Sequence, residues 1–212
     1  MITNDQLAGI VLCGGSSRRM GQEKYQLPFL GETLLQRICR IVRPEVSQIL
    51  IVAAANQQIL LSGSSVEVLR DDLPGAGPLA GIGQALRHLQ TSASSPVAGF
   101  VTSCDVPLLR AAVINCLRMH LTHEFDAVVI RDQGFSWPLC AVYRVTAANT
   151  AADLLKSGQR RAAALAENLR TCWLSLEVIR EVDPNLACLM NCNTPADVEA
   201  ALRHQCKFSS EA

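Results

Sequence analysis

Between Gly9 and Lys24 the chain reads GIVLCGGSSRRMGQEK, an apolar strand followed at once by a glycine-rich, basic loop. The residues Gly9–Cys13 are apolar on both faces, which is typical of a strand buried inside a parallel sheet. Glycine lets the backbone approach a ligand closely, and successive N–H groups in such a loop bind phosphate oxygens. We therefore expect the first strand of an α/β sheet here, with an anion site at its carboxyl end.

Downstream of this loop, short apolar runs alternate with amphipathic stretches along the whole chain. Further strands are predicted at Gln48–Ala53, Val66–Leu69, Val97–Thr102, Ala127–Arg131 and Leu139–Tyr143. Helices are predicted at Thr33–Val42, Leu79–Leu89, Ala111–His120, Thr146–Lys156, in Asp153–Arg170 with a break at Ser157-Gly158, and from Pro195 to about Arg203. This alternation predicts a single doubly wound, mostly parallel, Rossmann-like α/β sheet.

Length and charge limit the domain count and the partners. The 212 residues are expected to form one domain at residues 1–204, followed by a polar tail at 205–212 that frays. Lys and Arg number 19 against 19 Asp and Glu, so no basic surface for nucleic acid is expected. The longest apolar run, Ile49–Ala55, is far shorter than the ~20 residues that cross a bilayer. No basic residue precedes the apolar stretch Leu7–Cys13, so no targeting segment and no membrane contact are expected.

The nine cysteines are spread along the chain and include no CxxC pair. This spacing favours reduced thiols that pack as small hydrophobic side chains in a cytoplasmic protein. It argues against a structural zinc site.

The loop after the first strand concentrates positive charge, because it holds Arg18, Arg19 and Lys24 against the single acid Glu23. Phosphate binding is the functional interpretation, and a surface loop with solvated arginines is the alternative. The loop is not a P-loop, because Lys24 comes two positions too late after Gly21. Nor is a nicotinamide or flavin site expected at Gly75–Ala80, since that stretch does not follow the first strand and contains a proline.

Polar residues also follow the next three predicted strands. Asn56 and Asp71 offer groups that can read a nucleoside, although Asn56 can equally cap a helix and Asp71 can shape the turn into Pro74-Gly75. Asp105, in Ser103–Pro107, ends a central apolar strand. A lone carboxylate there suits Mg²⁺, which takes one or two protein carboxylates together with substrate phosphates. Its alternative role is to cap the helix that follows.

Near the end of the chain, Asn191 and Asn193 stand just before a predicted helix amino terminus at Pro195. Asn193 or Thr194 can cap that helix, and both asparagines can face the same site. The four histidines lie in or beside predicted helices, away from the strand ends. Catalysis by a histidine base is therefore not expected.

Taken together, these motifs resemble the nucleotidyltransferases that act on the molybdenum cofactor. Leu12–Gly21 with Lys24 is similar to their signature LAGGxSxRMGxxK, with Cys13 in place of the usual alanine. Later motifs follow in the same order, at Gly77–Gly81, Cys104–Pro107 and Asn193–Asp197. The resemblance runs from about Ala8 to Arg203 and implies a fold like that of the nucleotide-diphospho-sugar transferases.

The resemblance also implies roles for individual residues. Nucleotide-binding residues would be Leu12, Cys13, Gly14, Gly15, Lys24, Asn56, Asp71, Gly77, Pro78, Leu79 and Asp105. Arg19 and Lys24 would face the triphosphate and, with Asp105 as the Mg²⁺ ligand, would be catalytic. The acceptor would be contacted by Arg160, Arg161, Asn191 and Asn193.

The pair Gly14-Gly15 resembles the guanylyl-transferring members, because the cytidylyl-transferring relatives typically have LAAG there. The implied reaction is transfer of GMP from GTP to molybdopterin with release of pyrophosphate. The alternatives are the cytidylyl reaction of the same family and a non-catalytic nucleotide-binding module. The resemblance also implies transient contact with molybdoenzymes or with the chaperones that insert their cofactor.

Overall fold

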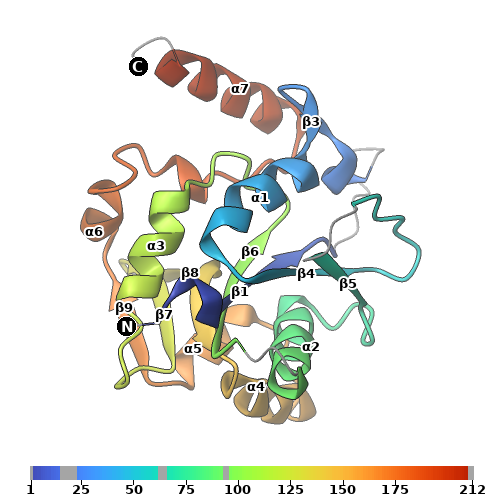
Figure 1. Ribbon diagram of the computed structural model, residues 1–212, viewed down its shortest axis with the longest axis vertical. Coiled ribbons are helices and arrows are strands. Elements are labelled where there is room, and N and C mark those ends of the chain that lie inside the picture. Colours follow the sequence, from blue (N-terminus) through green and yellow to red (C-terminus); the bar gives the residue numbers. More distant parts are fainter. Residues whose placement is uncertain (1, 15–22, 62–65, 93–95, 210–212) are drawn as a thin grey trace.

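A computed structural model describes residues 2–14, 23–61, 66–92 and 96–209, and its core is a seven-stranded sheet (Figure 1). From one edge to the other the strands are β5 (Val66–Arg70), β4 (Gln48–Ala53), β1 (Leu7–Leu12), β6 (Ala98–Ser103), β8 (Phe135–Arg144), β7 (Ala127–Asp132) and β9 (Thr171–Leu174). Among the described strands of this sheet, only β8 runs antiparallel to its neighbours. The predicted mostly parallel α/β sheet is confirmed.

Helices cover both faces of the sheet. One face is packed by α1 (Leu34–Val42), α3 (Ala111–Met119) and α6 (Leu176–Arg180). The opposite face, which lies lower in Figure 1, is packed by α2 (Pro78–Thr91), α4 (Ala147–Lys156) and α5 (Ala162–Glu167). All six residues of β1 are buried between these layers. Full burial of such Leu, Ile and Val side chains contributes about 1.5–3 kcal/mol each.

A smaller group of elements stands apart from the sheet, beside α1. It comprises the hairpin of β2 (Pro28–Phe29) and β3 (Glu32–Thr33) and the last helix, α7 (Pro195–Ser209), at the top of Figure 1. These elements share a small apolar cluster formed by Phe29, Leu34, Leu108, Ala187, Cys192 and Ala201. Four short 3₁₀ helices complete the described secondary structure: η1 (Asn4–Gln6), η2 (Lys24–Gln26), η3 (Arg43–Glu45) and η4 (Ala187–Leu189).

The order of the strands reverses at β1, which makes the carboxyl end of this strand a topological switch point. The chain leaves β1 for β4 and β5 on one side and then crosses to β6 on the other side. In register, Leu12 of β1 lies beside Ser103 of β6, so the loops that follow these two strands start side by side. Ligands of open α/β sheets bind where the strand order reverses in this way.

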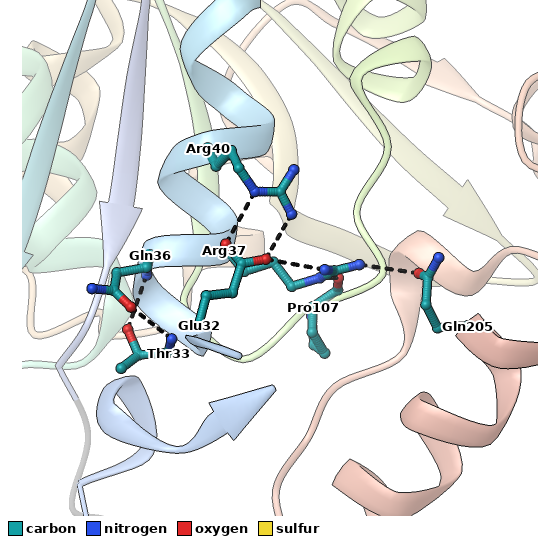
Figure 2. A network of polar contacts seen from close by, with 7 residues as sticks. All are labelled: Glu32, Thr33, Gln36, Arg37, Arg40, Pro107 and Gln205. Atoms are coloured by element: carbon teal, nitrogen blue, oxygen red, sulfur yellow. Dashed lines mark hydrogen bonds and ion pairs between the residues drawn. The ribbon is translucent and has the colours of Figure 1, made fainter. Parts of the chain in front are cut away.

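Most predicted boundaries agree with the structure, and Gln48–Ala53 matches β4 at both ends. The start of α1 is set by a capping box, because Thr33 Oγ1 accepts from Gln36 N (3.2 Å) and Thr33 N donates to Gln36 Oε1 (2.8 Å) (Figure 2). The strand predicted at Leu139–Tyr143 is longer, since β8 starts at Phe135 and pairs with β7 as a hairpin.

Three expectations are corrected. The strand predicted from Val66 is not buried on both faces, because β5 is an edge strand with half-buried and exposed residues. The strand β9 and the helix α6 were not predicted, since Thr171–Leu174 and Leu176–Arg180 are short. The last helix, predicted to end at about Arg203, continues to Ser209.

All nine cysteines are free thiols in the structure. In the part of the chain that the structure describes, no helix has the length and apolar character needed to span a bilayer.

Candidate functional site

Three side chains from distant parts of the chain meet at the carboxyl edge of the sheet. Lys24 Nζ donates to Asn193 Oδ1 at 2.6 Å and lies 3.5 Å from Asp105 Oδ2. Lys24 belongs to η2, Asp105 follows β6, and Asn193 lies two residues before α7. Sequence analysis proposed all three residues, and the structure brings them together. Below, we refer to Lys24, Asp105 and Asn193 as the Lys24 cluster.

The position of Asp105 follows from the end of β6. Cys104 N donates to Leu12 O (3.2 Å), which holds the loop after β6 against the end of β1. Ser103 Oγ then donates to Asp105 Oδ1 at 2.5 Å, and Cys192 N donates to the backbone oxygen of Asp105 at 2.7 Å. The side chain of Asp105 is only 15% exposed. The alternative role as a helix cap is wrong, because α3 begins at Ala111 with Arg110 as its N-cap residue.

The start of α7 orients Asn193. Asp197 Oδ2 accepts from Asn193 N at 2.8 Å and from Thr194 N at 2.7 Å, while Thr194 Oγ1 accepts from Asp197 N at 3.2 Å. The hydrogen bond from Asn193 N, aided by Thr194, holds the pKa of the Asp197 carboxyl below its ordinary value. Thr194 therefore caps the helix, and the Asn193 side chain points to Lys24 instead. Asn191 is exposed.

After β4, the residue that contacts the end of β1 is Gln57 and not its neighbour Asn56. Gln57 is 4% exposed, and its Nε2 donates to Cys13 O (3.2 Å) and to Glu23 Oε2 (2.8 Å). Its Oε1 accepts from Ala54 N (2.9 Å). Gln57 thus joins the end of β1 to the residue just before Lys24, whereas Asn56 is exposed on the turn. Sequence analysis missed Gln57, because a lone glutamine beside an asparagine carries no distinct signal.

Asp71 shapes its own turn at the end of β5. Its N–H donates to Ala53 O (2.8 Å) and its Oδ1 accepts from Leu73 N (3.0 Å), the pattern of an Asx turn. The turn role that sequence analysis kept as an alternative is therefore present in the structure.

The Gly77 motif and the Arg160 turn, far apart in sequence, lie against each other. Gly77 has a φ of +79°, and a Cβ atom there would approach Arg160 O to 2.8 Å. A side chain at this position is thus excluded both by conformation and by space. Pro78 opens α2, and Leu79 and Leu12 are buried, with 0% and 7% of their surface exposed.

The two arginines of that turn make local contacts. Arg160 Nη1 donates to Leu155 O (3.2 Å) and Gln159 O (3.1 Å), and Arg161 pairs with Glu167 at 3.4 Å. Both arginines are exposed, and the contacts found for them do not extend to the Lys24 cluster. Two further predicted site residues, Gly15 and Arg19, lie outside the described residues.

The thiols around Asp105 are poor nucleophiles. A hydrogen bond with the Cys104 thiol, together with burial, raises the pKa of the Cys13 thiol well above its ordinary value. Burial raises the pKa of the Cys192 thiol to about 12. Both thiols are therefore protonated at neutral pH, and thiolates are the reactive form.

The donor set at Asp105 suits a cation that brings its own oxygen ligands. Within the described residues, no group of three or more His, Cys, Asp or Glu side chains is arranged to hold a metal. Asp105 supplies one carboxylate, whose Oδ2 has Lys24 at the long distance of 3.5 Å. Mg²⁺ is commonly held by one or two carboxylates plus substrate phosphates, so this carboxylate fits such an ion and does not fit an all-protein metal cage.

Comparison with known families now identifies the chain. Residues 9–172 match the family described as the MobA-like NTP transferase domain. The chain belongs to this family. The matched range includes the Gly14 loop, Lys24, the Gly77 motif, Asp105 and the Arg160 turn, and it ends before Asn193.

Curated relatives match this chain over most of its length. A protein of Mycobacterium ulcerans named probable molybdenum cofactor guanylyltransferase is 35% identical over 199 residues, which cover 93% of this chain and 94% of that protein. A protein of Opitutus terrae with the same name is 40% identical over 155 residues, 73% of this chain and 74% of that protein.

Solved structures agree with the fold of the MobA-like family. Molybdopterin-guanine dinucleotide biosynthesis protein A from Archaeoglobus fulgidus superposes with a TM-score of 0.79 at 27% identity, covering 94% of this chain and 99% of that one. The 2-C-methyl-D-erythritol 4-phosphate cytidylyltransferase of Thermus thermophilus has a TM-score of 0.66 at 14% identity, over 92% of this chain and 97% of that one. The second likeness concerns the fold alone.

Proposed function

We propose that this nucleotidyltransferase moves GMP from GTP to molybdopterin, releasing pyrophosphate and forming molybdopterin guanine dinucleotide. The observation that carries the proposal is the Lys24 cluster, a cation and a carboxylate joined at the carboxyl ends of β1 and β6. The choice of GTP and molybdopterin as substrates is supported by relatives named probable molybdenum cofactor guanylyltransferase at 35–40% identity.

In this reaction the nucleotide lies across the carboxyl ends of β1 and β4. The backbone of Leu12 to Gly15 lies along the base and phosphates, with Asn56 and Asp71 at the nucleoside. Gln57 supports this wall from behind, because it holds Cys13 O and Glu23 together. Gly77 and Pro78 border the same site at the start of α2, and the buried Leu79 supports them from behind.

The chemistry needs positioning and charge more than proton transfer. The terminal phosphate of molybdopterin is largely dianionic at pH 7, since its second pKa is about 6, and it attacks the α-phosphate without a general base. The protonated thiols of Cys13 and Cys192 take no part in this step. His88 is engaged with Glu67, 3.0 Å away on β5, and does not serve as a base.

Lys24 and Arg19 offset the repulsion between the two phosphates and the charge that develops on pyrophosphate. Asp105 would hold Mg²⁺, which supplies further neutralisation of the phosphate oxygens when bound. If a cation were bound to Asp105, Lys24 would keep its hydrogen bond to Asn193, and its ammonium group would face the nucleotide. Asn193 thus orients Lys24 as well as bordering the acceptor.

The acceptor contacts Asn191 and Asn193, which lie just before α7. It also contacts Arg160 and Arg161, in the turn that packs against Gly77. The guanidinium groups of these arginines are exposed, so they are accessible to the anionic end of molybdopterin. Nine free thiols fit a reducing compartment, and we place the enzyme in the cytoplasm, where transient contact with molybdoenzymes or insertion chaperones delivers the product.

The deciding experiment measures pyrophosphate release with molybdopterin and each of GTP, CTP, ATP and UTP in the presence of Mg²⁺. Release with GTP alone is expected. Release with CTP alone would replace the proposal by the cytidylyl reaction of the same family. Nucleotide binding without pyrophosphate release, whatever the acceptor, would replace it by a non-catalytic nucleotide-binding module.

A further inference from the structure

A buried arginine of α1 contacts both of the segments that lead away from the Lys24 cluster. Arg37 is only 8% exposed, although it carries a charge and α1 lies on the outside of the sheet. Its Nε donates to Pro107 O at 2.5 Å, its Nη1 to Glu32 Oε1 at 3.1 Å, and its Nη2 to Gln205 Oε1 at 3.0 Å. Figure 2 shows the guanidinium between the loop at Pro107 and the helix that carries Gln205.

An aromatic ring also packs against the Arg37 guanidinium. Its central carbon lies 4.7 Å from the centre of the Phe29 ring, in the β2–β3 hairpin. Arg37 therefore joins α1 to three other segments: the hairpin, the loop after β6 and α7. A planar guanidinium can satisfy three such partners at once, whereas a lysine ammonium is a single point charge.

Each of these partners is close in sequence to a member of the Lys24 cluster. Pro107 comes two residues after Asp105, in the loop that Arg37 holds through its backbone oxygen. The hairpin directly follows η2, which contains Lys24. The segment before α7 bonds to Asp105 through Cys192 N (2.7 Å) and to Lys24 through Asn193.

The helix α7 is thus attached at two points. Its start lies on the Lys24 cluster, and Gln205, on its third turn, lies on Arg37. From Pro195 to Gln205 the helix rises about 15 Å, so a small rotation about either point displaces the other. The apolar side of α7 contributes the buried Ala201 and the partly buried Val198 and Leu202 to a shared cluster. The hydrogen bond from Arg37 to Gln205 adds a polar contact further along the helix.

We propose that Arg37 is a positioning residue for nucleotidyl transfer: it sets the distance between Asp105 and Lys24 by holding the Pro107 loop and α7 in one arrangement. Arg37 touches neither substrate nor metal. The inference rests on the proposed function, since it concerns the same site.

The test uses Arg37→Ala and Arg37→Lys, with Arg40→Ala as the matched control. Arg40 is on the same helix and binds the same partner, with Arg40 Nη2 2.6 Å from Glu32 Oε1 (Figure 2). It has no hydrogen bond to Pro107 or Gln205 among the contacts of the described residues. Removing Arg40 therefore removes a surface ion pair, and removing Arg37 frees the loop and α7.

The readouts are kcat and KM for GTP, and the Mg²⁺ concentration that gives half-maximal rate, each per folded protein. Displacement of a catalytic group by about 1 Å costs on the order of 10²-fold in rate, so both Arg37 variants are expected to lose kcat to that order. We expect them also to need more Mg²⁺, with KM for GTP changed less than kcat. Arg40→Ala is expected to stay near wild type. Methylguanidinium added to Arg37→Ala should restore part of the rate, and methylammonium should not.

If Arg37→Ala does not fold, Gln205→Leu decides, because it removes the hydrogen bond between Arg37 and α7 and leaves the bonds of Arg37 to Pro107 and Glu32 in place. A smaller fall in kcat of the same kind is expected, together with faster hydrogen exchange in α7. Folded Arg37 or Gln205 variants with wild-type kcat and Mg²⁺ requirement would overturn the role of Arg37, even if they melt at lower temperature. A wild-type protein that transfers no GMP would instead refute the proposed function.

Discussion

Asp105 makes three contacts, two through its carboxylate oxygens and one through its backbone oxygen. Oδ1 accepts from Ser103 Oγ, Oδ2 faces Lys24 Nζ, and the backbone oxygen accepts from Cys192 N. The first contact fixes the side chain and the third fixes the backbone, so little reorganisation is needed when a cation approaches Oδ2. Such preorganisation of charge is usually the largest contribution of a site to phosphoryl transfer.

Asp105→Asn removes the negative charge at nearly constant shape. We expect kcat/KM for GMP transfer to fall by on the order of 10²–10³, the cost of losing a preorganised electrostatic contact. The measurement is initial-rate pyrophosphate release at saturating Mg²⁺. Asp153→Asn is the control, because Asp153 is exposed on α4 and pairs only with Lys156 in a surface i,i+3 contact. Turnover of Asp105→Asn close to that of Asp153→Asn would refute the metal assignment at Asp105.

At the scale of elements, the start of α7 depends on one carboxylate. Asp197 accepts both backbone N–H groups that precede the helix, and Thr194 returns a bond to Asp197 N. This reciprocal cap sets the direction in which the Asn193 side chain leaves the backbone. The precision of the Lys24 cluster therefore depends on a helix cap as well as on the sheet.

Asp197→Asn should loosen this cap in a pH-dependent way. The pKa of Asp197 is lowered in the folded protein, so its contribution to stability is full above the ordinary value of 3.8 and is lost as pH falls through the lowered pKa. Hydrogen exchange of the amides of residues 193–198 should be faster in the variant at pH 7, and thermal unfolding should occur earlier. The difference between the two proteins in thermal unfolding should shrink in strongly acidic solution.

Glu199→Gln controls for the loss of a negative charge on α7, since Glu199 contacts Arg203 at 3.7 Å, one turn further along. Equal exchange rates in Asp197→Asn and Glu199→Gln at pH 7 would contradict the role given to the cap.

At the scale of the molecule, the sheet gathers residues that the chain separates by up to 169 positions, as with Lys24 and Asn193. The carboxyl ends of β1, β4, β5 and β6 lie at one edge because these strands are parallel. The ligand therefore joins segments from both halves of the chain. Binding should stabilise the whole fold and not one loop.

Mg²⁺-GTP is accordingly expected to raise the melting temperature. At a free concentration of 100 times Kd a ligand that binds only the folded state adds about 2.7 kcal/mol. For a domain of this size that corresponds to a rise of roughly 5–10 °C. Chelation of Mg²⁺ should remove a large part of the shift, and Asp105→Asn should show the smaller shift with or without the metal. A shift with GTP that is unaffected by chelation would contradict a metal shared by Asp105 and the phosphates.

Much of the fold could be predicted because its strands and helices follow from local patterns of apolar and capping residues. The strand at Gln48–Ala53 and the helix starting after Thr33 follow from an apolar run and a capping box. The antiparallel direction of β8 could not be predicted, since a buried strand has the same apolar pattern in either direction. The short β9 was missed for a similar reason: four residues carry too little pattern to distinguish a strand from a turn.

For the site, residue type and position predicted Lys24 and Asp105 after strands and Asn193 before a helix, but not how the three would meet. Gln57 and Arg37 were missed because their role lies in their partners. Arg37 does stand three residues after Leu34 on the apolar stripe of α1, which is a signal for a buried arginine, but its partners Pro107 and Gln205 are 70 and 168 positions away.

The sequence by itself determined the class of the protein, a mostly parallel α/β sheet with a glycine-rich, basic loop and a carboxylate at strand ends. Hydrophobic periodicity and turn chemistry act over a few residues, so a single sequence records them directly. Only the tertiary structure decided that Lys24 binds Asn193 beside Asp105, that Gln57 supports the loop, and that Arg37 holds α7. Those pairings depend on the crossing of the chain from β5 to β6 and on the docking of α7, where burial of distant surfaces outweighs any local preference.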